Sequence, residues 1–74
     1  NIIFMKFKKF TFHNLLHDIL HDEIFQTLTE KTTEIENKGG KVHFFSHSIT
    51  STIREQDGVL RENFKGSLII SYQE

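Results

Sequence analysis

Three of the five histidines are spaced four residues apart in one stretch of the chain. His13, His17 and His21 follow one another at i, i+4 and i+8, a spacing that stacks side chains on one side of a helix. Asp18 and Asp22 lie next to this row, and imidazole together with carboxylate suits zinc, copper or nickel. The row is the candidate metal site of the sequence, although the interpretation that we favour is the polar flank of an amphipathic helix.

Sequence patterns of catalysis give little support for an enzyme. In the zinc-protease pattern a glutamate that acts as general base directly follows the first histidine, whereas Asp18 follows His17 here. The chain also lacks a glycine-rich phosphate loop, a nucleophile elbow and any cysteine. We therefore expect a protein that is not an enzyme and that needs no cofactor.

The other two histidines alternate with apolar residues in a second stretch. His43, Phe45, His47 and Ile49 occupy every second position, and such residues share one face of a strand. An unpaired polar group costs roughly 1 to 3 kcal/mol when it is buried, so this face is either incompletely covered or opens into a pocket. His43, Phe45 and His47 are therefore candidates for a ligand or subunit contact. An interface that contains histidines should loosen in mild acid, where imidazole gains a positive charge.

The first histidine row must be positioned by a helix, which we predict over residues 13–37. Asn14 is the expected N-cap, and Gly39-Gly40 supplies the left-handed C-cap. The helix has two apolar groups whose centres are offset by about 140° around its axis. Either the helix breaks near Asp22, or it is continuous and its second apolar surface needs a partner. We favour continuity, because neither proline nor glycine interrupts the segment. The first group is Leu15, Leu16, Ile19 and Leu20, and the second is Ile24, Phe25, Leu28 and Ile35, of which Ile24, Phe25 and Leu28 are interface candidates.

Strands are predicted on both sides of this helix. Residues 2–12 change the parity of their apolar positions, which predicts a bulge near Lys8 or a strand that is apolar on both faces; we favour the bulge. A long strand follows Gly40, residues 54–58 form a turn at Asp57-Gly58, and a last strand runs to the C-terminus. Gly66 indicates a bulge or a close approach of the backbone.

Length and composition limit the classes of protein. A chain of 74 residues forms one domain, residues 1–74, and hides only roughly 60% of the surface of its unfolded chain. Without cysteine it has no disulfide, so self-association is the expected supplement. Nine basic and ten acidic residues nearly cancel, which disfavours nucleic acid. The apolar run at residues 2–5 is too short to span a membrane, and we expect a cytoplasmic protein.

The predicted fold is α+β with the order β-α-β-β, in which one long helix packs on a three-stranded antiparallel sheet with a long C-terminal hairpin. This order and the ending Gly66-Ser67-Leu68-Ile69-Ile70-Ser71-Tyr72 resemble the dodecin-like group of small oligomeric proteins and short sporulation-associated proteins. Dodecins bind flavin between subunits with a tryptophan, and this chain has none, so the resemblance implies oligomerisation rather than flavin.

The function that the sequence favours is a non-enzymatic structural or protein-interaction module that forms a homo-oligomer or binds a protein partner. The alternative is a protein that binds a metal or a flavin-like small molecule at a subunit interface.

Overall fold

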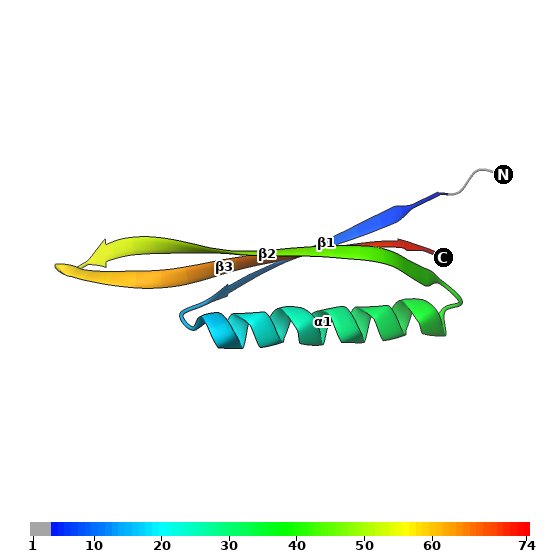
Figure 1. The fold of residues 1–74 in the computed structure, drawn as a ribbon, viewed down its shortest axis with the longest axis horizontal. Coiled ribbons are helices and arrows are strands. Elements are labelled where there is room, and N and C mark those ends of the chain that lie inside the picture. The colour runs from blue at the N-terminus through cyan, green and yellow to red at the C-terminus, as the bar shows by residue number, and fades with distance from the viewer. Residues whose placement is uncertain (1–3) are drawn as a thin grey trace.

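The computed structural model describes residues 4–74 as one helix against one sheet (Figure 1). The sheet has the strand order β1-β3-β2, and both pairings are antiparallel. The helix covers one face of the sheet and leaves the other face open, which confirms the predicted α+β fold. The elements in chain order are β1 (Lys6–Asn14), α1 (His17–Asn37), β2 (Lys41–Gln56) and β3 (Val59–Gln73).

Strand β1 is apolar on both faces and has no bulge. Its pairing with β3 runs without a shift from Lys6 opposite Tyr72 to Asn14 opposite Phe64, so the predicted bulge near Lys8 is wrong. Phe10 and Phe12 point toward the helix and pack against the core, whereas Phe7 lies on the open face and is 63% exposed. The change of parity in the sequence therefore reflects two aromatic faces. Residues 2 and 3 of the predicted strand lie outside the described residues.

The bulge lies in β2 instead, at His43. Val42 pairs with Tyr72 and Phe44 with Ser71, so His43 is the extra residue of the strand. One extra residue moves every preceding side chain to the other face, which places Val42 on the helix side together with Phe45. The prediction that His43 shares a face with Phe45 is therefore wrong.

Helix α1 starts later than predicted. Leu16 occupies the N-cap position and makes no capping hydrogen bond with its side chain. Asn14, the predicted N-cap, is the last residue of β1, and its side-chain Oδ1 accepts a hydrogen bond of 3.0 Å from the Leu16 backbone N–H. The asparagine thus forms the turn between strand and helix, a local role that competes with capping.

From His17 the helix is continuous through Asp22 to Asn37, as we favoured. Its end is closed as predicted by Gly39, whose φ of 83° is the left-handed conformation. The Gly40 N–H donates to the Ile35 carbonyl at 2.9 Å and the Gly39 N–H to the Glu36 carbonyl at 3.0 Å, the bonding pattern of the Schellman motif.

The core lies between α1 and the central strand β3. Gly66 allows a close approach of the two elements, because a Cβ atom there would lie 2.7 Å from the Ile24 Cδ1 atom. Gly66 pairs in register with Phe12 and Ile49, so it marks a close approach and not a bulge. The buried apolar residues of the core are Leu20, Ile24, Ile35, Leu68, Ile70 and Tyr72.

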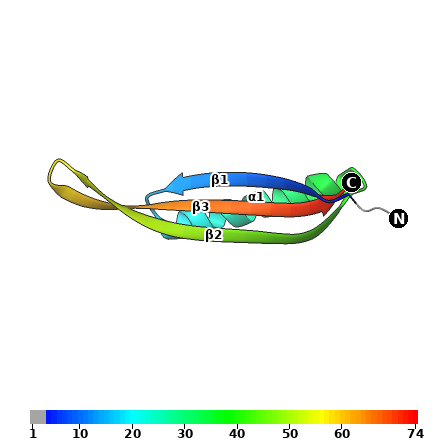
Figure 2. The same cartoon turned by 90° about the horizontal axis from the view of Figure 1, so that it is seen from above.

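The C-terminal hairpin is longer than predicted. Residues 54–56, predicted in the turn, belong to β2, and the strands stay paired up to Gln56 opposite Val59. Asp57 and Gly58 alone form the loop, and their φ angles of 53° and 76° are those of a type I′ turn. The hairpin extends beyond the N-terminal end of α1 (Figures 1 and 2).

The molecule is consequently elongated. Its radius of gyration is 15.9 Å, whereas about 11 Å is typical of a compact domain of this length. Within residues 4–74, no helix combines the length and the apolar character that crossing a bilayer requires.

Candidate functional site

A row of rings lies between α1 and the β2 side of the sheet, and we call it the histidine–aromatic strip. It consists of His17, His21 and Phe25 of α1 with Phe45 and His47 of β2. Ring centroids are 4.6 Å apart for His21 and Phe25, 4.9 Å for Phe25 and His47, and 6.2 Å for Phe25 and Phe45. His21 lies 6.3 Å from His47 and 6.5 Å from His17. The strip is therefore one connected set of contacts between two elements.

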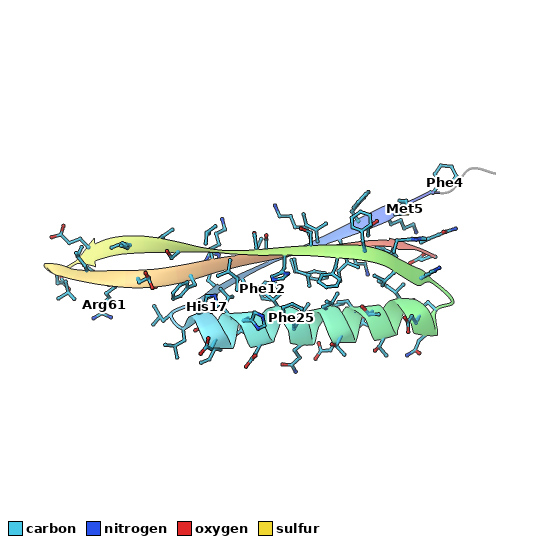
Figure 3. All side chains as sticks on the ribbon, viewed as in Figure 1. Phe4, Met5, Phe12, His17, Phe25 and Arg61 are labelled. Atoms are coloured by element: carbon cyan, nitrogen blue, oxygen red, sulfur yellow. The ribbon has the colours of Figure 1, made fainter. Side chains whose placement is uncertain are left out.

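Two periodicities bring these side chains together. His17, His21 and Phe25 are four residues apart on the helix, and Phe45 and His47 are two apart on the strand, so each set lies on one face. The N-terminal half of α1 runs beneath β2 (Figure 2), and His17 and Phe25 lie between helix and sheet (Figure 3). The strip follows from the crossing of these two faces.

The strip is accessible from the side of the molecule. Phe45 is 44% exposed, and the side chains of His17 and His21 are 52% and 49% exposed. Phe25 is half-buried. Aromatic rings bury large areas when they are covered, so the strip is suited to contact with a further surface.

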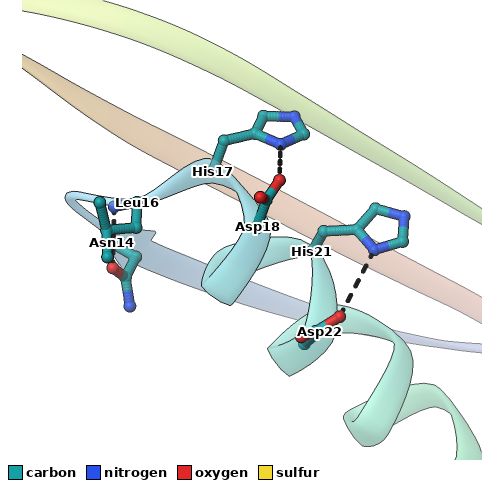
Figure 4. A network of polar contacts seen from close by, with 6 residues as sticks. All are labelled: Asn14, Leu16, His17, Asp18, His21 and Asp22. Atoms are coloured by element: carbon teal, nitrogen blue, oxygen red, sulfur yellow. Dashed lines mark hydrogen bonds and ion pairs between the residues drawn. The ribbon is translucent and has the colours of Figure 1, made fainter.

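Each helix histidine has an aspartate beside it (Figure 4). His17 Nδ1 lies 3.5 Å from Asp18 Oδ1, and His21 Nδ1 lies 3.9 Å from Asp22 Oδ1. Both aspartates are exposed, and these contacts become ion pairs only when the imidazoles are protonated. Such exposed pairs contribute little free energy, so they do not fix the rings.

The metal row predicted from the sequence is divided between two elements. His13 lies on β1 and is exposed, whereas His17 and His21 lie on α1. The three histidines could share one helix face only if the helix began at residue 13. The turn formed by Asn14 makes the helix begin at His17 instead. Among residues 4–74, no group of three histidine, cysteine, aspartate or glutamate side chains is arranged to hold a metal ion. The ring contacts of the strip therefore favour packing over coordination.

The six ligand or interface candidates separate into three groups. Phe25, Phe45 and His47 meet in the strip. Ile24 is fully buried in the chain's own core, and Leu28 is partly buried against it. Both side chains point at the sheet because they continue the helix face of the buried Leu20.

His43 stands apart from the strip. It is exposed at the bulge of β2, and its Nε2 lies 3.3 Å from Gln73 Oε1 at the end of β3. The alternation of the sequence placed it with His47, but the extra residue at the bulge ends that alternation.

The open face of the sheet carries an apolar group that the sequence did not reveal. Phe7 and Phe44 lie opposite Ser71 from both sides, and Phe44 is 53% exposed. Ser71 between them is fully buried, and its hydroxyl has no hydrogen-bond partner among the described residues. Only the register of the sheet brings these three residues together, so no local pattern could have found them.

A notch of about 560 Å³ lies where the hairpin leaves the body of the molecule. Leu15 and Phe64 line it together with Arg54, Lys65 and other polar residues. Phe64 also contacts His17 of the strip, with ring centroids 5.5 Å apart, but no residue of the strip lines the notch.

The chain ends are joined by an exposed ion pair between Lys6 Nζ and Glu74 Oε2 at 3.0 Å. The hydrogen bond to Glu74 raises the pKa of Lys6, and the same bond lowers the pKa of Glu74. The contribution of ionised Glu74 to stability is therefore lost as the pH falls through its lowered pKa. The contribution of protonated Lys6 to stability is lost as the pH rises through its raised pKa. Solvent screens the pair, so it contributes little to stability.

Comparisons with protein-family models, curated proteins and solved structures find no match to this chain. The structure has the β-α-β-β order from which the resemblance was argued, and no match supports the dodecin-like group itself.

Proposed function

We propose that this protein is a non-enzymatic module that self-associates and acts through contacts between its copies or with a protein partner. The observation that carries the proposal is the small core. Six apolar side chains are buried, whereas eleven large apolar side chains of residues 4–74 are exposed. A single copy thus leaves more large apolar side chains exposed than it fully buries, and seven others are only partly buried against the core.

The free energy gained by burying these exposed apolar side chains favours association. Fully burying one such side chain stabilises by about 1.5 to 3 kcal/mol, and a whole domain is stable by only about 5 to 15 kcal/mol. A second copy that covers a few of these side chains would therefore stabilise the fold by an amount comparable to its total stability. The absence of cysteine fits the reducing cytoplasm, which is the compartment that we propose.

The test is the mass in solution, measured by sedimentation equilibrium over the micromolar range. We expect a defined multiple of 8.7 kDa, with dissociation on dilution. A monodisperse species of 8.7 kDa at every concentration would overturn the proposal.

The second candidate function is binding of a planar small molecule between copies. The half-exposed rings of Phe25 and Phe45 favour it, because flat ligands stack on aromatic rings. Flavin would raise the melting temperature if the native state binds it, and zinc and nickel added in turn test the metal-binding alternative in the same way. An unchanged melting temperature with flavin, alongside a defined oligomer, would leave self-association as the function.

A further inference from the structure

Resting on the proposed self-association, we infer that β2 forms the contact. Its free edge pairs antiparallel with β2 of a second copy, about a two-fold axis at His47, and the histidine–aromatic strips of the two copies close over one another. The sheet then continues through the dimer.

The free edge of β2 has the composition of a pairing surface. β2 lies at one end of the sheet order, so one side of its 16 residues has no neighbouring strand. Residues 42–53 contain neither a charged side chain nor a proline. Long edges without charge or proline are templates for another strand, because their backbone N–H and C=O groups are unpaired.

The opposite edge of the sheet is protected. β1 carries Lys6, Lys8 and Lys9 in its first four residues. Lysines on an edge strand oppose pairing with another molecule, since a second copy would bring the same charges against them. The two edges therefore differ in charge, which decides whether another strand can pair with them. Of the two, only the edge of β2 is free of charged side chains over residues 42–53.

Symmetry sets how the two strands meet. In an antiparallel pair, opposite residues project from the same face of the sheet, so a two-fold axis must pass where one residue meets its own copy. Both helices then lie on one side of the extended sheet. With the axis at His47, Phe45 lies opposite Ile49 of the second copy, and an aromatic ring beside a β-branched side chain is a favourable cross-strand pair.

The bulge sets the length of regular pairing. About an axis at His47, residues 44–50 pair with residues 44–50 of the second copy, because the bulge at His43 changes the faces of the residues that precede it. These residues extend over about 23 Å at roughly 3.3 Å per residue.

A matched pair of substitutions tests the edge. Ser48 on β2 and Thr11 on β1 lie on either side of Ser67 in the sheet, and both are exposed. We expect Ser48→Lys to raise the dissociation constant of the dimer at least about tenfold, because two lysines then meet near the axis. Thr11→Lys makes the same change on the edge that already carries lysines, and we expect no effect on dissociation.

The outcomes separate the two proposals. A monomeric wild-type chain would overturn the self-association itself. An oligomeric wild-type chain whose dissociation constant is unchanged by Ser48→Lys, with circular dichroism showing both variants folded, would overturn the β2 contact and leave self-association standing.

Hydrogen exchange gives a readout that does not depend on a variant. The backbone N–H groups on the free edge of β2 have no partner strand within one copy. In the assembled protein every second amide of residues 44–50 should therefore be protected by the second copy, and should lose protection on dilution. Exchange of these edge amides at the solvent rate in the assembled protein would overturn the contact.

Discussion

Gly66 is a residue at which the core leaves no space for a side chain. A Cβ atom there would lie 2.7 Å from the Ile24 Cδ1 atom, and Ile24 is itself fully buried. Gly66→Ala should therefore lower the free energy of unfolding by about 1 to 3 kcal/mol, because an overpacked core must shift. Urea denaturation of the two chains measures the difference.

The matched control removes the atom that clashes. Ile24→Val deletes Cδ1, and in the double variant the added methyl group has space, so the two substitutions should destabilise less together than the sum of their separate effects. Strict additivity would show that Gly66 is not needed for the approach of helix and sheet.

At the scale of elements, the N-cap position of α1 is occupied by Leu16, whose side chain makes no capping hydrogen bond. Leu16 has extended backbone angles, and its carbonyl accepts the first helical hydrogen bond from Leu20 N–H at 3.1 Å. A leucine side chain cannot accept hydrogen bonds from the free N–H groups of the first turn. Leu16→Ser should therefore stabilise the protein by about 0.5 to 2 kcal/mol, measured by urea denaturation at one protein concentration.

Leu15→Ser is the control for that change. Leu15 is also an exposed leucine next to the helix, but it precedes the N-cap position. The serine there removes the same apolar side chain without providing a cap, so no stabilisation is expected. Equal effects of the two substitutions would contradict the capping argument.

At the scale of the whole molecule, the strip makes the proposed assembly sensitive to acid. His17, His21 and His47 lie within one set of ring contacts, and Asp18 and Asp22 are the acidic groups beside the two helix histidines. Two copies joined at β2 bring six imidazoles together. Protonation of imidazole in mild acid would then place like charges in the contact.

The measured mass should accordingly fall toward 8.7 kDa between about pH 8 and about pH 5. His47→Gln should weaken this dependence. His43→Gln should leave it unchanged, because His43 lies at the bulge outside the strip. A mass that is the same at both pH values would remove the histidines from the contact.

Features that depend on a few neighbouring residues could be predicted from the sequence. The left-handed Gly39 ends α1, and the Asp57-Gly58 turn closes the hairpin, because each conformation is set by local backbone sterics. The continuity of α1 also followed from local propensity, since no proline or glycine interrupts it. These signals determined the β-α-β-β order and the fold class.

Features that depend on pairing between distant residues were decided only by the tertiary structure. A strand pattern does not say which residue is left over, so the bulge was predicted at Lys8 and lies at His43. The register alone buries Ser71 between Phe7 and Phe44. The five histidines were visible in the sequence, but which of them meet depends on how α1 crosses β2. Non-local register and the crossing of two elements leave no signal in local spacing, and the crossing assembles the histidine–aromatic strip. The predicted row is divided because β1 includes His13 and ends at Asn14, and the helix begins only at His17.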